Sequence, residues 1–289
     1  MMGHAPQGVD ILLIKLPWWA GQVPADHRRG RTSPQKDTFG SVVPRVTSTG
    51  RIGRSLSCQP VPDRLKQVSQ LYQVARIHSA GSELRLSLPI RSRSGNLVVD
   101  GWTAFPYLVG EHQPGRWLEL ARIARDFAAL FTNAERPDFI DMRTHAWARA
   151  DRFAWGEDDG PPIAAPYVAD LVSARRQVFD PAGIIHGDLT GNVLFDPALP
   201  PAVIDLTVYW RPVNYSIAVI AADAVCFEGA PLSLFETISP TSDFPQYLIR
   251  ALLFRLVADC VHGRPGSEYG VYDSAVDRVL ELAGDQEPG

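Results

Sequence analysis

The chain has 289 residues, 45% of them hydrophobic and 21% charged, with a formal net charge of −4. This length and composition suffice for one large domain or two modest ones with a sizeable core. A weakly acidic chain gives no electrostatic reason to expect nucleic acid as a partner. The cysteines, Cys58, Cys226 and Cys260, form no CxxC pair, so neither a disulfide framework nor a zinc knuckle is indicated and a cytoplasmic location is expected.

The beginning of the chain differs in composition from the rest. The strand-like run "DILLIKLP" contains Lys15 and Pro17 and is too short to span a membrane. From residue 21 to residue 62 the sequence is rich in Arg, Ser, Thr, Gly and Pro and keeps no period of 2 or 3.6. We therefore expect residues 1–62 to form a poorly ordered or atypical N-terminal segment, with Lys15 a solvated lysine.

The next stretch, residues 63–105, predicts a small partial N-terminal lobe made of a helix and a β-hairpin. Asp63 is a suitable N-cap, and the apolar stripe of the helix is Leu65, Val68, Leu71, Tyr72 and Ala75. Alternating leucines at 84, 86 and 88, followed by the turn "SGN" and the run "LVV", indicate the hairpin. The segment "TAFPYLVGE" (103–111) is interpreted as a connector.

Residues 106–289 predict a mainly helical C-terminal lobe. Apolar residues recur at helical spacing from Trp117 to Phe131, and "WARADRFAWG" and "YVADLVSARRQVF" indicate further helices. The short strands "IIHGD", "NVLFD" and "AVIDL" follow, and the chain is mostly helical from Ile217 onward. The fold class is thus α+β with two lobes, and a cleft between lobes is a common place for a small-molecule site.

The stretch "IIHGDLTGNVLFD" (184–196) combines His186, Asp188 and Asn192 in an apolar frame, and Asp205 ends the next strand. An Asx turn between two strands would explain Asp188 and Asn192 alone, but the addition of Asp205 favours a site. A carboxylate that accepts a hydroxyl proton, with a carboxamide and a second carboxylate for magnesium, is the inventory that phosphoryl transfer needs. A hydrolase is disfavoured because no nucleophile elbow is present.

These motifs resemble the aminoglycoside phosphotransferase and choline kinase-like family, and in particular a subgroup of uncharacterised actinobacterial members with "HGDLxGNVLF" and "AVIDLxxYWRP". The resemblance covers the chain from about Asp63 to its end and implies a protein-kinase-like fold that uses ATP and Mg²⁺ to phosphorylate a hydroxyl of a small molecule. It implies that Asp188 is the catalytic base and that Asn192 and Asp205 are magnesium ligands. By the same resemblance, His186 is a structural member of the loop and Asp223 braces the loop.

The sequence departs from the family pattern at three places. Only Leu189, Thr190 and Gly191 separate Asp188 from Asn192, one residue fewer than in the common loop of the family. No glycine follows Asp205 directly. No glycine-rich turn with a following lysine strand precedes the helix at Asp63, and Lys15 lies about fifty residues too far upstream for usual loop lengths. The N-terminal lobe is therefore incomplete, and a non-catalytic or impaired kinase-like binding protein is the alternative.

Overall fold

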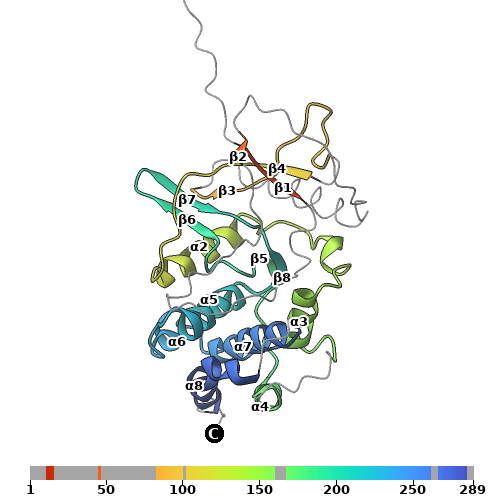
Figure 1. The fold of residues 1–289 in the computed structure, drawn as a ribbon. Coiled ribbons are helices and arrows are strands. Elements are labelled where there is room, and N and C mark those ends of the chain that lie inside the picture. The colour runs from red at the N-terminus through yellow and green to blue at the C-terminus, as the bar shows by residue number, and fades with distance from the viewer. Residues whose placement is uncertain are drawn as a thin grey trace, which may run out of the picture.

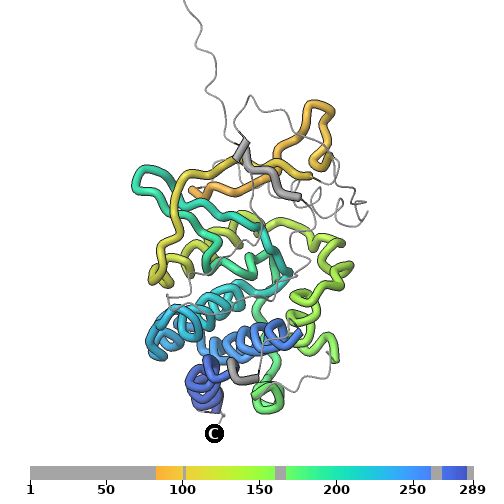
Figure 2. The backbone as a smooth tube through the Cα atoms, in the orientation of Figure 1, coloured from red at the N-terminus to blue at the C-terminus, as the bar shows by residue number. Residues whose placement is uncertain are grey.

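The computed structural model describes residues 11–15, 45–46, 83–99, 102–159, 167–261 and 266–284 (Figure 1), and Figure 2 traces the backbone in the same orientation. Two of the small sheets lie toward one end of the molecule and most of the helices toward the other, with strands β5 (Gly183–His186) and β8 (Val208–Arg211) between them (Figure 1). The fold is therefore α+β with a small sheet part and a mainly helical C-terminal part, as the sequence predicted. The helix expected after Asp63 lies outside the described residues.

The described strands form three small sheets. In chain order the strands are β1 (Ile11–Lys15), β2 (Arg45–Val46), β3 (Arg85–Leu86), β4 (Trp102–Pro106), β5 (Gly183–His186), β6 (Val193–Asp196), β7 (Leu199–Val203) and β8 (Val208–Arg211). The sheet orders are β2-β1-β4, β3-β7-β6 and β5-β8. The predicted strands "IIHGD" and "NVLFD" are both present, but they do not pair with each other: β5 pairs with β8 and β6 with β7.

The first sheet contains Lys15, which the sequence analysis placed too far upstream to belong to a compact lobe. Strand β1 pairs antiparallel with β4 along its whole length, from Ile11 opposite Pro106 to Lys15 opposite Trp102. The loop-length argument that excluded Lys15 from a compact lobe was therefore wrong, because strand pairing does not require partners that are close in sequence. Residues 103–106, the first part of the segment expected to be a connector, belong to strand β4.

The expected hairpin at residues 84–99 is only partly present. Its turn exists, since the Gly95 N–H donates to the Ser92 carbonyl at 2.9 Å and Gly95 has a φ of +84°. Strand β3, however, pairs in parallel with β7 and not with the "LVV" run. The alternation of leucines correctly indicated a strand but contained no information about its partner, which lies more than a hundred residues away in the chain.

The helices make up most of the C-terminal part. They are α2 (Trp117–Ala129), α3 (Ala146–Trp155), α4 (Val168–Ala174), α5 (Val213–Phe227), α6 (Leu234–Thr237), α7 (Phe244–Val261) and α8 (Asp273–Gly284), with short 3-10 helices at Asp138–Ile140 and Gly266–Tyr272. Helix α2 buries the predicted stripe, including Leu120, Ile123 and Phe127. Helix α4 ends at Ala174, earlier than "YVADLVSARRQVF" suggested. No helix in the described ranges combines the length and hydropathy of a membrane span.

Helices α5 and α7 form the centre of the core. Both are buried on nearly all sides, and α7 packs against α3, α4, α5 and α8. A helix that is apolar all round belongs in a protein interior, so the few polar side chains on these two helices need partners. Two of these side chains are hydrogen-bonded to each other: Arg255 of α7 donates to Asp223 of α5. This pair lies next to the candidate site.

Candidate active site

The loop between β5 and β6 carries the residues singled out in the sequence. The Gly187 N–H donates to the Thr207 carbonyl at 2.8 Å, which ties the start of the loop to the segment before β8. A Cβ atom on Gly187 would lie 2.3 Å from ring carbons of Tyr209, so only glycine fits against this ring. Gly191 has a φ of +82°, and the Asn192 N–H donates to the Leu189 carbonyl at 2.9 Å. These contacts close the shortened loop into a tight turn.

His186 connects the loop to the Asp205 segment. Its Nδ1 accepts a hydrogen bond from the Asp188 N–H at 3.1 Å, so its Nε2 carries the proton and donates to the Asp205 carbonyl at 2.8 Å. The residue is 1% exposed, and burial lowers the pKa of the imidazole to about 4. His186 is therefore neutral and holds two backbone segments together.

The Asp188 carboxylate is held from two sides and is still accessible. Its Oδ1 lies 2.6 Å from Nη2 of Arg255, and its Oδ2 accepts a longer bond from Nδ2 of Asn192 at 3.3 Å. The side chain is 39% exposed. An oriented and partly exposed carboxylate of this kind can accept a proton from a bound hydroxyl.

The amide nitrogen of the Asn192 side chain is hydrogen-bonded, whereas its amide oxygen is hydrogen-bonded to no residue that the structure describes. Its Nδ2 donates to the Asp188 carbonyl at 2.7 Å and to the Asp188 carboxylate, and these bonds fix which end of the amide is nitrogen. Its Oδ1 is buried and has no hydrogen-bond partner among the described residues. An unpaired buried acceptor calls for an explanation such as a bound ion or an ordered water.

Asp205 follows β7 in a strained conformation. It has a φ of +47°, and its carbonyl accepts hydrogen bonds from His186 and from the Thr207 N–H, the latter at 2.6 Å. Burial, and next the negative charge of Asp188, raise the pKa of the Asp205 carboxyl to about 7. The two carboxylates are thus close enough to repel each other, and a cation between them would relieve that repulsion.

This group of oxygens fits a magnesium ion. The Asp205 carboxylate and the unpaired amide oxygen of Asn192 are hard ligands, which magnesium prefers in proteins. The described residues contain no group of three or more His, Cys, Asp and Glu side chains that could hold a metal ion. The candidate ligands here are the Asp205 carboxylate and the amide oxygen of Asn192, with Asp188 as a neighbouring negative charge.

Asp223 reaches the loop through a residue that the sequence analysis missed. Arg255 of α7 donates from Nε and Nη2 to the two oxygens of Asp223, at 2.7 and 2.6 Å, and from Nη2 to Asp188. Burial lowers the pKa of the Arg255 guanidinium, but the charges of Asp223 and Asp188 outweigh burial and raise the pKa well above its ordinary value. The one available signal was a lone arginine in the apolar run "LLFRLVA".

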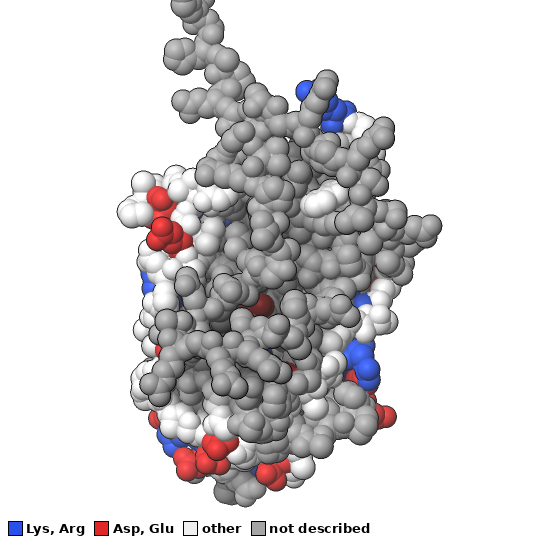
Figure 3. Space-filling model, in the orientation of Figure 1, with Lys and Arg blue, Asp and Glu red and all other residues white. Residues whose placement is uncertain are grey.

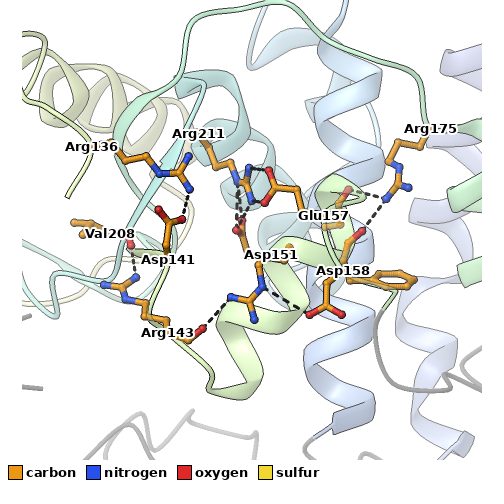
Figure 4. Close-up of polar contacts among 12 residues, drawn as sticks. Arg136, Asp141, Arg143, Asp151, Glu157, Asp158, Arg175, Val208 and Arg211 are labelled. Carbon is orange, nitrogen blue, oxygen red and sulfur yellow. Dashed lines mark hydrogen bonds and ion pairs between the residues drawn. The ribbon is translucent and has the colours of Figure 1, made fainter. Parts of the chain in front are cut away.

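A second group of charges holds the strand behind the loop. Arg211 of β8 donates to Asp151 of α3 at 2.7 Å and to Glu157, which follows α3, at 2.8 Å (Figure 4). Arg143 donates to the Val208 carbonyl of the same strand (Figure 4). Since β8 pairs with β5 at His186 opposite Val208, these contacts fix the strand on which the loop begins. They also place Glu157 in an ion pair with Arg211.

The surface gives less information than the loop. A hollow of about 490 Å³ lies between the start of α2 and the α6 region and is lined by none of the predicted site residues. On the face drawn in Figure 3, most of the described acidic and basic side chains lie in small groups near the edges, and acidic atoms also show near the centre. The candidate chemistry therefore lies in the loop and its neighbours.

Comparisons with known proteins give similarity of arrangement only. No family model matches the chain and no curated protein matches it. Among solved structures, an aminoglycoside phosphotransferase from Alicyclobacillus acidocaldarius subsp. acidocaldarius DSM 446 has a TM-score of 0.46 and 12% identity, covering 78% of this chain and 83% of that one. The AMP-bound spectinomycin phosphotransferase APH(9)-Ia has a TM-score of 0.46 and 12% identity, with 79% and 85% covered.

The aminoglycoside phosphotransferase APH(4)-Ia is similar to the same degree, with a TM-score of 0.46, 16% identity and coverage of 75% of this chain and 83% of that one. At such identities and TM-scores, residue roles do not transfer from those structures to this chain. The function has to follow from the geometry of the chain's own residues.

Proposed function

We propose that this protein is an ATP-dependent phosphotransferase that acts on a hydroxyl group of a small molecule. The observation that carries the proposal is the turn that brings together a partly exposed, oriented Asp188 carboxylate and the buried, unpaired oxygen of Asn192. Asp205 lies close enough to Asp188 for the charge of one to raise the pKa of the other. A plain Asx turn would leave neither an orphaned amide oxygen nor two repelling carboxylates.

The roles follow from the hydrogen bonds. Asp188 accepts the proton of the attacking hydroxyl, since it is the accessible carboxylate of the group. Asn192 Oδ1 and the Asp205 carboxylate hold magnesium, which when bound neutralises charge on the nucleotide phosphates. His186 does not take part in proton transfer, because both of its nitrogens are bonded to backbone groups and burial lowers its pKa to about 4.

The test is calorimetric titration of the full chain with ATP in the presence and absence of Mg²⁺. We expect binding that depends on Mg²⁺, and a greater loss of Mg²⁺-dependent affinity in Asp205→Asn than in Asn192→Ala. The reason is that a carboxylate contributes a full charge to the ion and an amide only a dipole. Equal affinity with and without Mg²⁺ would contradict the assignment of the ligands, and a greater loss in Asn192→Ala would reverse their ranking.

A further inference from the structure

Arg255 makes more contacts than a core ion pair needs. Its guanidinium engages both oxygens of Asp223 through Nε and Nη2 and uses the same Nη2 to reach Asp188 Oδ1 at 2.6 Å. Arg255 is 7% exposed and Asp223 is 2% exposed. The two-point bond to Asp223 already pairs the buried charge, so the bond to Asp188 is an additional feature directed at the candidate site.

The guanidinium is fixed in direction by the core. Asp223 belongs to α5 and Arg255 to α7, the two helices that are buried on nearly all sides. The guanidinium carbon also lies 5.1 Å from the ring centroid of Phe254 and 5.7 Å from that of Trp147. A forked bond to a buried acid and packing against two rings leave the Nη2 donor little freedom, so it offers Asp188 a hydrogen bond from a constant direction.

The contact makes the two oxygens of Asp188 unequal. Oδ1 accepts the short bond from Arg255, whereas Oδ2 accepts only the 3.3 Å bond from Asn192. We propose that Arg255, anchored by Asp223, is the positioning residue for Asp188 and leaves Oδ2 as the oxygen that accepts the proton. This inference rests on the proposed phosphotransferase function.

The proton balance is simple. The O–H bond of the acceptor hydroxyl breaks and its proton goes to Asp188 Oδ2. The hydroxyl oxygen forms a bond to the γ-phosphorus of ATP, and the bond from that phosphorus to the β,γ-bridging oxygen breaks with its electron pair to release ADP. Asp188 then loses the proton to solvent, for which its 39% exposure gives a path.

The charge of the group suits this role. Arg255 carries one positive charge and Asp223 and Asp188 one negative charge each, so the three together remain negative. Asp223 therefore lets Arg255 orient Asp188 without cancelling the charge on which proton transfer depends.

The test compares the same substitution at two arginines of α7. Arg255→Lys keeps a positive charge but cannot fork onto Asp223 while donating to Asp188 in the same geometry. Arg250→Lys is the matched control, because Arg250 is also buried but donates to the backbone carbonyls of Gln246 and Arg176. For parent and variants we would measure ADP formation from Mg-ATP, with water and with a mixture of small alcohols as acceptors. The melting temperature and calorimetric Mg-ATP affinity would be measured on the same preparations.

We expect Arg255→Lys to lower kcat by roughly ten- to a hundredfold, the effect of misplacing a reacting group by about an ångström, while Mg-ATP affinity changes by less than about twofold. Arg250→Lys should lose a comparable amount of melting temperature and keep kcat within about twofold of the parent. A parent-like kcat in Arg255→Lys, or an equal loss of kcat in both variants, would overturn the positioning role.

Two further outcomes are distinguishable. If Arg255→Lys does not fold, Asp223→Asn takes its place, since it weakens the anchor of Arg255 with little change of volume. The expected result is again lower kcat with unchanged Mg-ATP affinity, and an unchanged kcat overturns the inference. A parent chain that neither binds Mg-ATP nor forms ADP would contradict the proposed function itself, and with it the role of Arg255.

Discussion

At the scale of single residues, His186 determines how the candidate site is assembled. One ring nitrogen accepts from the backbone of Asp188 and the other donates to the backbone of Asp205. The Ser216 hydroxyl of α5 donates to the His186 carbonyl at 2.6 Å, which ties this bridge to the helical core. The two carboxylates are therefore brought together by backbone contacts of one buried histidine, in spite of their mutual repulsion.

The raised pKa of Asp205 predicts a specific pH dependence of stability. The folded-state pKa of about 7 lies above the ordinary 3.8, so the metal-free folded protein holds a proton that the unfolded chain has released. The stability contribution of this group is present below about pH 4 and is lost as the pH rises through about 7. One pKa unit corresponds to about 1.4 kcal/mol, so the loss is on the order of a few kcal/mol.

The measurement is chemical unfolding of the metal-free protein at several pH values between 5 and 8. Asp205→Asn removes this titration, so its stability relative to the parent should increase with pH across that window. The matched control is Glu135→Gln at an exposed position, which should follow the parent. A difference between Asp205→Asn and parent that stays constant with pH would show that Asp205 does not titrate in this range.

Candidate site residues could be identified from the sequence where they belong to a short continuous motif. "HGDLTGN" and "VIDL" indicated Asp188, Asn192 and Asp205, and the structure brings them together. Arg255 could not be predicted in this way, because its contact with Asp188 spans 67 positions of the chain. A charged residue in an apolar helix signals only that a partner exists, and the identity of that partner depends on how the helices pack.

At the scale of elements, α3 and β8 form the support of the site. The bidentate contacts of Arg211 link the buried Asp151 of α3 to the strand that pairs with β5. Gly156 ends α3 with a φ of +75°, and Arg175 donates to the Phe153 carbonyl at 2.7 Å in the last turn of that helix (Figure 4). The end of α3 and the position of Glu157 are thus fixed by hydrogen bonds.

The two acids that bind Arg211 should differ in their contribution to stability. Asp151 is buried and Glu157 has a 45% exposed side chain. Removing a partner of a buried pair costs about 3–5 kcal/mol, whereas an exposed partner contributes roughly 0–1 kcal/mol. We expect Asp151→Ala to lower the free energy of unfolding several-fold more than Glu157→Ala, as measured by urea unfolding. Similar losses for both variants would mean that Arg211 does not depend on its buried partner.

Strand β1 should contribute to the fold because it is the central strand of its sheet. It has β2 on one side and β4 on the other, so a proline within it removes a ladder hydrogen bond whichever way the residue faces. Leu13→Pro is expected to lower the melting temperature by several degrees, since each kcal/mol corresponds to about 2–4 °C in a chain of this size.

Leu118→Pro is the matched control for this substitution. Leu118 is the second residue of α2 and is 62% exposed, and proline is tolerated in the first turn of a helix. Its melting temperature should stay close to that of the parent. An equal effect of the two prolines would show that β1 does not contribute to the stability of the sheet.

At the scale of the whole molecule, the candidate site lies where the sheet part meets the helical part (Figure 1). Glu111, which follows β4 in the chain, forms an isolated antiparallel β-bridge with Phe195 of β6. Arg85 of β3 donates to the carbonyls of Pro200 in β7 and Val109, at 2.7 and 2.8 Å. The strands that carry the loop are thereby tied to the sheet part, while α5 and α7 support the loop from the other side.

The α+β class and the main helices and strands after residue 116 could be predicted, because hydrophobic periodicity is a local property of the sequence. The pairing of β1 with β4 and of β3 with β7 could not, since both pairs join segments far apart in the chain. The expected boundary between residues 62 and 63 stays a prediction. Strand β1 lies on its N-terminal side and nevertheless belongs to the sheet.

The central claim, that Asp188 is the base of a magnesium-dependent phosphotransferase, is tested most directly by the rate of ADP formation from Mg-ATP in the parent and in Asp188→Asn. Water and a mixture of small alcohols serve as acceptors, and calorimetry on the same samples reports Mg-ATP affinity. We predict Mg²⁺-dependent ADP formation in the parent and a rate lower by about 10²–10⁴ in Asp188→Asn, with Mg-ATP affinity retained. A variant that forms ADP at the parent rate, or a parent that binds Mg-ATP and forms no ADP with any acceptor, would contradict the claim.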